Sequence, residues 1–300
     1  GHLDLYLLFI SPFIYLFGTY TLLLFQIIAL SFGGFGVYRY FNLFENKTIP
    51  IYATLYYYLF FGIYAAVASD YHSIVVASSL IPWFFVSVKQ NRKWLTCVLF
   101  FFILVAQENI ALWMFFICIG LLIEYRKEKQ KTSLLSILSG ISLVYFLLVI
   151  HFVIPCFSAL NEYGGFQYSS LGSNFFEALK AIVSSPIQSI KILFTNHINS
   201  PHGDFVKTET HLIIFISGLF LLIKKPHFLI MLIPIYFEKF FHDNISVWGI
   251  GNQYNIQFAP ILAIGIFSVI SEFKTVYGRK AMITIILFMV TGATIRTMDN

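Results

Sequence analysis

The feature that most constrains this chain is an alternation of two kinds of polar break between long apolar runs. Fourteen of its 19 Lys and Arg residues fall in five short breaks, and the breaks between these carry almost no positive charge. Short basic loops of membrane proteins stay in the cytoplasm, so the alternation predicts which breaks share one side of a bilayer. The basic breaks cover residues 39–48, 89–93, 124–132, 224–225 and 274–280.

The composition leaves little room for a water-facing surface. The chain is 58% hydrophobic and only 11% charged, whereas a soluble domain carries about 25% charged residues. The net charge of +5 does not indicate a nucleic-acid partner, because the basic residues lie at the ends of apolar runs and not on one polar face. We therefore expect an integral membrane protein whose main partner is the lipid bilayer.

The apolar runs predict the fold class. Three of them, 19–38, 49–68 and 133–154, have the 20 residues that cross about 30 Å of hydrocarbon. With the shorter runs, they predict an all-α polytopic bundle of about 10 spans, forming a single membrane domain over residues 1–300. The shorter runs are 73–88, 94–106, 108–123, 211–223, 227–241, 256–271 and 281–295.

The breaks without positive charge define the side opposite the cytoplasm. The largest are 155–210 and 242–255, which we expect to be extracytoplasmic. Residues 155–210 are too many for a bare loop, and apolar residues recur with helical spacing in 174–182 and 186–195, so amphipathic surface helices are predicted there. Residues 5–17 are predicted to form a short helix at the outer interface that ends near Pro12 and Gly18.

Gln107-Glu108-Asn109 separates two apolar runs that are each about 20 Å long as helices, which is less than the hydrocarbon thickness. The tip of this hairpin should therefore lie below the outer surface, where a turn is tolerated only if it is buried in protein or lines water. Glu108 is predicted to line an outward-facing cavity. The alternative is that the bilayer thins locally and Glu108 is solvated at the interface.

Other polar residues of the outer side offer further site candidates. Asp70 and His72 flank Tyr71 in a short turn, where they could form an acid/base pair, two metal ligands or merely a solvated turn. The aromatic residues of Tyr163–Tyr168 could stack on a sugar or lie in the interfacial aromatic belt. Glu238 either joins the cavity of Glu108 or pairs with the neighbouring Lys239.

Several of these segments, taken in order, resemble one family over nearly the whole chain. It is a group of bacterial polytopic membrane proteins of unknown function, the DUF family numbered 2079. Ser73 and Ile74 depart from its usual Pro-Glu, and Gln107 departs from its usual Lys. The matching segments are His2-Leu-Asp4, Asp70-Tyr-His72, Gln107-Glu108-Asn109, Ile154-Pro155 followed by Tyr163-Gly-Gly, and Gln253-Tyr254 before Pro260.

The layout of this family is similar to that of the C-type membrane glycosyltransferases. The resemblance implies an outward-facing site that uses a polyprenyl-phosphate sugar donor, with an acidic residue of the first outer loop as base or metal ligand. Family members carry an additional span and an acidic outer loop ahead of the His2 position. Because this chain begins at Gly1, we expect it to be an N-terminally truncated piece of a bacterial cytoplasmic-membrane protein.

The first hypothesis is therefore a membrane glycosyltransferase. A carboxylate would deprotonate the acceptor hydroxyl, and either a divalent cation such as Mg²⁺ or Mn²⁺ or a basic side chain would offset the charge of the leaving phosphate. No metal ligands are assigned. The candidate catalytic residues are Asp4, Asp70, His72 and Glu108, and the candidate substrate-binding residues are His2, Asn109, Tyr163, Tyr168, Glu238, Gln253 and Tyr254.

Two hypotheses of other classes stay open. A transporter or flippase of a lipid-linked substrate would show internal repeats and polar residues near the bilayer midplane, and neither is evident in the sequence. A membrane assembly subunit without a ligand would leave the outer polar residues separated from one another. Fold-level analogy alone does not decide between these classes.

Overall fold

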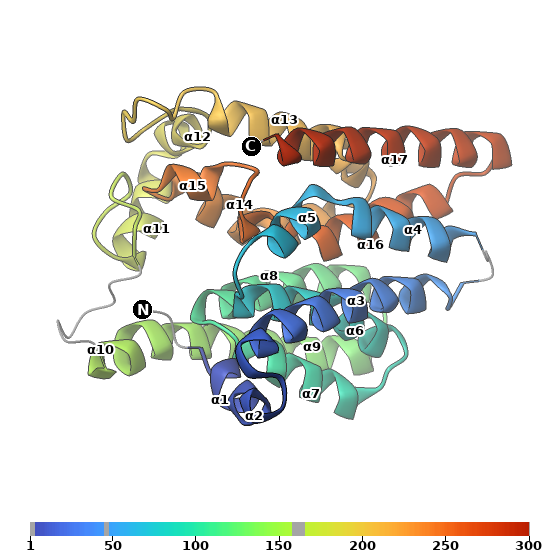
Figure 1. Cartoon of the computed structure of the whole chain (residues 1–300), viewed down its shortest axis with the longest axis horizontal. Helices are drawn as coiled ribbons and strands as arrows, with labels where there is room; N and C mark the ends of the chain where they lie inside the picture. The colour runs from blue at the N-terminus through green and yellow to red at the C-terminus, as the bar shows by residue number, and fades with distance from the viewer. Residues whose placement is uncertain (1–3, 45–47, 158–165, 300) are drawn as a thin grey trace.

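The computed structural model describes residues 4–44, 48–157 and 166–299, and within these ranges it contains helices and loops but no strand. Most helices lie along one long axis (Figure 1). The long helices are α3 (Thr21–Phe41), α4 (Ile49–Leu59), α5 (Phe61–Ala68), α6 (Ser73–Lys89), α7 (Lys93–Leu104), α8 (Glu108–Glu124), α9 (Lys129–Leu148), α13 (Val206–Ile216), α14 (Pro226–Phe241), α16 (Phe258–Ser271) and α17 (Val276–Met298).

Successive helices run back and forth, and the basic breaks meet at one end of the molecule, which we call the basic end (Figure 1, right). Contacts between the breaks define this end. They are the Lys89 ammonium 3.1 Å from the centre of the Phe44 ring, the Asn91 amide 3.0 Å from Gln130, His227 4.0 Å from Glu124, and Lys225 2.6 Å from Glu272.

Four helical segments of the described chain are long and apolar enough to cross a membrane. A fifth is the bent pair α4–α5. The prediction of an all-helical membrane protein is thus confirmed, but the ten predicted spans are supported by length for at most five. Helices such as α6 and α8, with 17 residues each, reach about 25 Å at 1.5 Å per residue. The four segments are Tyr6–Phe41, Lys129–Phe157, Gln253–Ser271 and Val276–Met298.

The N-terminal segment coils through short turns before α3. Helices α1 (Tyr6–Ile10) and α2 (Ile14–Phe17) are joined by a 3₁₀ turn that contains Pro12. The α-helix therefore ends just before Pro12, but the chain continues through Pro12 as a 3₁₀ turn and does not leave the helical path there. A proline is tolerated there because it lies in the first turn, where its missing N–H costs nothing. Gly18, at φ 57°, redirects the chain into α3. Tyr15 is 95% exposed, which suits contact with lipid.

Helix α8 lies at the centre of the bundle and packs against α7, α9 and α14. Its side chains Trp113, Ile117 and Leu121 are almost completely buried. Ser142 of α9 donates a 2.7 Å hydrogen bond to the Ala111 carbonyl, which fixes the register of α9 against α8. The bundle therefore places the start of α8 at the end opposite the basic end, between α9 and α14.

The two helices predicted in the long polar stretch are present at this opposite end as α11 (Phe175–Ser184) and α12 (Pro186–Phe194). Their apolar faces are only partly covered, since Val183 and Ile187 are largely exposed. Leu171, Ala178, Ile192 and Phe241 form a small hydrophobic cluster that attaches the two helices to α14. This cluster is separate from the main core of the bundle.

The bend between α4 and α5 measures 46° and occurs at Phe60, whose backbone is extended. It brings Gly62 against the 3₁₀ turn Gln253–Asn255. A Cβ atom at Gly62 would lie 2.5 Å from the carbonyl oxygen of Asn255, whereas a Cβ at Gly140 of α9 would meet nothing within 4 Å. The backbone of a turn cannot move aside as a flexible side chain can. Gly62 is thus required by close packing.

We predict that Gly62→Ala destabilises the protein by about 1–3 kcal/mol, the usual cost of overpacking a rigid site. Gly140→Ala is the matched control and should be neutral or stabilising, because alanine is the better helix former. Thermal unfolding of the detergent-solubilised protein measures both. Equal melting temperatures for the two variants would contradict the contact between α5 and the turn Gln253–Asn255.

Candidate functional site

The Asp70–His72 turn lies at the end opposite the basic end and is held by Gln26 of α3. The Gln26 amide donates to the Ala66 carbonyl at 2.9 Å, and its Oε1 accepts from the His72 N–H at 2.8 Å. Burial and then the charge of the nearby Asp4 raise the pKa of Tyr71. This part of the molecule, which we call the Asp70 turn, therefore gathers Asp4 and Asp70–His72.

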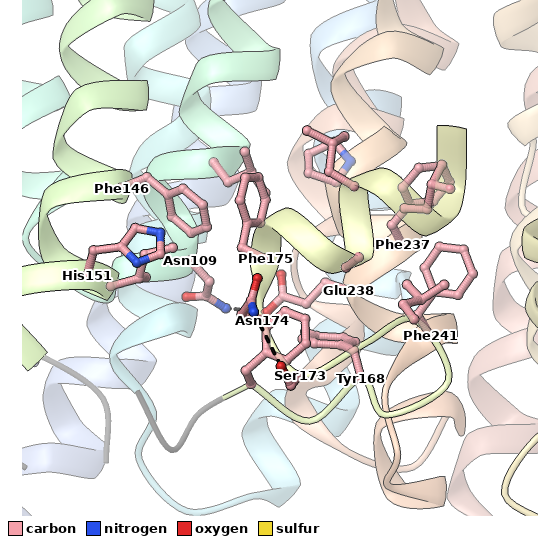
Figure 2. Close-up of a pocket in the computed structure, with 18 of the residues that line it drawn as sticks. Asn109, Phe146, His151, Tyr168, Ser173, Asn174, Phe175, Phe237, Glu238 and Phe241 are labelled. Carbon is pink, nitrogen blue, oxygen red and sulfur yellow. Dashed lines mark hydrogen bonds between the residues drawn. The ribbon is translucent and has the colours of Figure 1, made fainter. Parts of the chain in front are cut away.

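A cavity of about 660 Å³ opens beside it, between α8, α9, α11 and α14 (Figure 2). The turn that starts α8 joins the two regions. On one side, the Leu5 N–H donates to the Val105 carbonyl at 3.3 Å, and on the other, Asn109 lines the cavity. The cavity has the size of a small-molecule site.

The carboxylate of Glu238 is fixed at the cavity by two donors from α8. Oε1 accepts from the Asn109 amide, and Oε2 accepts from the Trp113 indole N–H at 2.6 Å. Asn109 and Trp113 are four residues apart, so both side chains lie on one face of α8. An ionisable group at this depth needs such partners, because an isolated carboxylate is costly in an apolar setting.

The cavity has a polar and an apolar side. Figure 2 shows Asn109, Glu238, Ser173 and Asn174 gathered together. The remaining surface is mainly hydrocarbon and aromatic. Its larger side chains are Phe116, Phe146, Ile150, Phe166, Phe175, Ile182, Phe237 and Phe241. A ligand that fills both sides must itself be amphiphilic.

A reciprocal N-terminal cap fixes α11, one wall of the cavity. The Asn174 side-chain oxygen accepts from the N–H groups of Phe176 and Glu177, at 3.1 and 3.0 Å. The Glu177 carboxylate in turn accepts from the N–H and hydroxyl of Ser173, at 2.7 and 2.9 Å. These hydrogen bonds, chiefly the one from the Ser173 N–H, lower the pKa of Glu177. The polar rim is therefore ordered by the same contacts that start the helix.

Two buried lysines bind main-chain carbonyls and do not line the cavity. Lys239 donates to the carbonyls of Val247 and Gly249, at 2.6 and 2.9 Å. Lys207 donates to two further carbonyls, those of Ile192 and Phe240, each at 2.6 Å. Each ammonium therefore binds backbone oxygens of the protein itself.

Arg296, in the last turn of α17, pairs with Glu209 at 2.8 Å. Lys180 and Lys191 are exposed on α11 and α12 and do not line the cavity. Among the described lining residues there is thus no Lys or Arg.

The predicted site residues fall into three groups. Asn109, Tyr168 and Glu238 line the cavity. Asp4, Asp70, His72, Glu108, Gln253 and Tyr254 are not among its lining residues, and His2 and Tyr163 lie outside the described residues. Glu108 is completely buried at the first position of α8, next to Asn109. Gln253 and Tyr254 belong to the turn that packs on α5.

The sequence analysis did not single out Trp113, Ser173 or Asn174. A signal existed for two of them. Trp113 follows Asn109 by one helical turn, which predicts a shared face, and Asn174 precedes Glu177 by three residues, as in a capping box. No signal in the sequence indicates that Asn109 and Trp113 of α8 bind Glu238.

No three His, Cys, Asp or Glu side chains of residues 4–44, 48–157 and 166–299 are close enough to hold a metal ion. His197 belongs to a small group of titratable side chains: it contacts Lys207 at 2.8 Å and lies 3.8 Å from Asp243. Desolvation and the charge of Lys207 lower the pKa of His197. This group tethers the loops at the opposite end and lies outside the cavity lining.

Comparison with known proteins identifies the family. Residues 1–299 match the family described as predicted membrane protein (DUF2079), and the chain belongs to it. No curated protein and no solved structure matches the chain. The family description supports integration in a membrane and names no reaction.

We predict that Asn174→Ala loosens the start of α11. Loss of an N-cap side chain costs about 1 kcal/mol, so the amides of residues 175–178 should exchange with deuterium about five times faster. Asn244→Ala is the matched control. Asn244 caps a different helix, α15 (Ile245–Trp248), by accepting from the Ser246 N–H at 2.9 Å, so this variant should leave exchange in α11 unchanged. If Asn174→Ala left exchange in α11 unchanged, the cap would not be what orders this wall.

Proposed function

We propose that this DUF2079 membrane protein transfers a sugar from a polyprenyl-phosphate donor to an acceptor at the cavity. The observation that carries the proposal is a carboxylate, Glu238, held by neutral donors in a cavity with one polar and one hydrocarbon side. A lipid-anchored substrate of such a reaction is itself divided in this way. The likeness of the family layout to the C-type glycosyltransferases supports the same assignment.

The reaction requires one base and one leaving group. An acceptor hydroxyl gives its proton to a carboxylate, and its oxygen forms a bond to the anomeric carbon of the donor sugar. The bond from that carbon to the phosphate oxygen breaks, and the polyprenyl phosphate leaves with the electron pair. Glu238 is the Asp or Glu side chain found among the described lining residues, so it is the base we propose.

The leaving phosphate needs positive charge, and no Lys or Arg among the described lining residues supplies it. We propose that a divalent cation such as Mg²⁺ or Mn²⁺, or a basic residue outside this chain, supplies it. Asp4, Asp70, His72 and Glu108 remain the other candidates for catalytic residues that the sequence predicts. The Asp70 turn is adjacent to the cavity through the start of α8.

The proposed orientation follows from charge. We propose about ten crossings of a bacterial cytoplasmic membrane, with the basic end in the cytoplasm. The passes are α3, α4–α5, α6, α7, α8, α9, α13, α14, α16 and α17. Residues 155–210 and 242–255 are then extracytoplasmic, and the cavity opens on the outer side. The short helices span only with local thinning of the bilayer or with cover from neighbouring helices.

Replacing the proposed base tests the function. We expect Glu238→Gln to lower transfer of a radiolabelled hexose from polyprenyl phosphate by about 10²–10⁴-fold, the usual contribution of a general base. The assay uses the full-length protein in proteoliposomes. Glu209→Gln, which alters a carboxylate paired with Arg296 far from the cavity lining, is the matched control and should keep normal activity.

Asp70→Asn distinguishes the two regions in the same assay. A full loss of transfer in Asp70→Asn, with normal transfer in Glu238→Gln, would move the base to the Asp70 turn. Absence of transfer by the wild-type protein with every polyprenyl-linked hexose would contradict the proposed activity itself.

Labelling with a membrane-impermeant maleimide tests the orientation, in a background lacking Cys97, Cys118 and Cys156. We expect Ser184→Cys, on exposed α11, to be labelled in intact cells. Lys127→Cys, in an exposed basic break, should be labelled only after the cells are permeabilised. The reverse result would invert the proposed topology.

A further inference from the structure

We infer that the cavity binds the acceptor as an amphiphile with an uncharged, hydroxyl-bearing headgroup, and that it excludes the phosphate of the donor. This inference rests on the proposed function and specifies which of the two substrates the cavity takes. It follows from the charge of the cavity, from its hydrogen-bonding character and from its hydrocarbon side.

The charge of the cavity is negative. Glu238 and one imidazole, that of His151, lie among the described lining residues, and no Lys or Arg does. Lys239, the neighbour of Glu238, is bound to the carbonyls of Val247 and Gly249. A phosphate placed here would face the Glu238 carboxylate in an apolar setting with no Lys or Arg to offset the two negative charges, which is unfavourable.

The polar side of the cavity calls for hydrogen-bond donors. The Glu238 carboxylate can only accept when it is ionised. The Asn109 oxygen next to it is buried and receives no hydrogen bond from the described residues. A buried acceptor of this kind is costly to leave unmet. A phosphate brings further acceptors, whereas a hydroxyl brings a donor.

The remaining polar groups favour a hydroxyl over a cationic headgroup. At the rim, the Asn174 amide donates to the Ser173 hydroxyl at 3.3 Å, and the proton of that hydroxyl goes to Glu177. The amide keeps a second N–H, so a sugar hydroxyl, which donates and accepts, can bind both Glu238 and the Asn174 amide. An ammonium could satisfy only the acceptors. The aromatic rings around this rim, among them Phe175 and Tyr168, present faces on which a sugar ring can lie.

The hydrocarbon side of the cavity takes the acyl or prenyl chain. Phe146 and Ile150 of the α9 wall face Ile182 and Phe237 of α11 and α14 across the cavity. Phe152 and Phe157, which follow Ile150 along the chain, are exposed. The lipid chain of the bound amphiphile would lie against this hydrocarbon side, with its hydroxyl headgroup directed to Glu238.

Chain-matched ligands that differ only in headgroup test the inference. Tritiated dodecyl β-glucoside, dodecyl phosphate and dodecylammonium are bound below their micellar concentrations to the full-length protein in nanodiscs. Scintillation proximity measures binding. We expect the glucoside to bind at least about tenfold more tightly than the phosphate, as one charge-assisted hydrogen bond provides. Equal or tighter binding of dodecyl phosphate or of the ammonium would overturn the inference.

Two variants tie the selectivity to the named residues. Glu238→Gln removes the negative charge and should improve dodecyl phosphate binding by about tenfold while weakening the glucoside. Asn109→Leu should weaken the glucoside, and Glu209→Gln should bind all three ligands as the wild type does. A melting temperature measured for each variant separates loss of binding from loss of fold. Unchanged selectivity in a folded Glu238→Gln variant would refute the role of this carboxylate.

The binding experiment is independent of the transfer assay. Glucoside selectivity without any sugar transfer would refute the proposed function and leave a cavity for a neutral glycolipid. Sugar transfer with preferential phosphate binding in the cavity would support the enzyme and refute the inference. The two ideas therefore fail through different results.

Discussion

The pair of hydrogen bonds from α8 to Glu238 is the constraint on which the end of the molecule opposite the basic end depends. Helices α8 and α14 contain 17 and 16 residues, so neither is long enough to position itself by spanning a bilayer. Their mutual packing and these polar contacts set their register instead. At the basic end, the same two helices approach again through Glu124 and His227, 4.0 Å apart. Each helix thus gives one carboxylate to its partner, at opposite ends.

The fold could be predicted to a useful degree because its main determinants are local. The run 133–154 lies within the helical segment Lys129–Phe157, and the two helices expected in the long polar stretch correspond to α11 and α12. Length, hydropathy and caps are properties of neighbouring residues. The path through Pro12 was not predictable in the same way, because a proline can end a helix or begin a turn.

The site could be predicted only in part, because it depends on helix rotation and on distant partners. The sequence marks Gln107-Glu108-Asn109 as important, yet successive residues of a helix point about 100° apart. Packing of α8 between α9 and α14 buries Glu108 and gives Asn109 to the cavity. Glu238, which binds Asn109, is 129 residues away. No local pattern encodes that pairing, although an acid in an apolar run already marked Glu238 as unusual.

The way in which the buried Lys239 of α14 anchors the loop 242–255 has an evolutionary consequence. Lys239 holds Val247 and Gly249 through their main-chain oxygens, and Asn255 binds the carbonyls of Gly249 and Ile250 in the same manner, each at 3.1 Å. Main-chain oxygens are present whatever the side chain. The loop can therefore change its outward-facing residues from one family member to another while its backbone keeps its place beside α14. Diversity of surface chemistry at this end is compatible with an unchanged architecture.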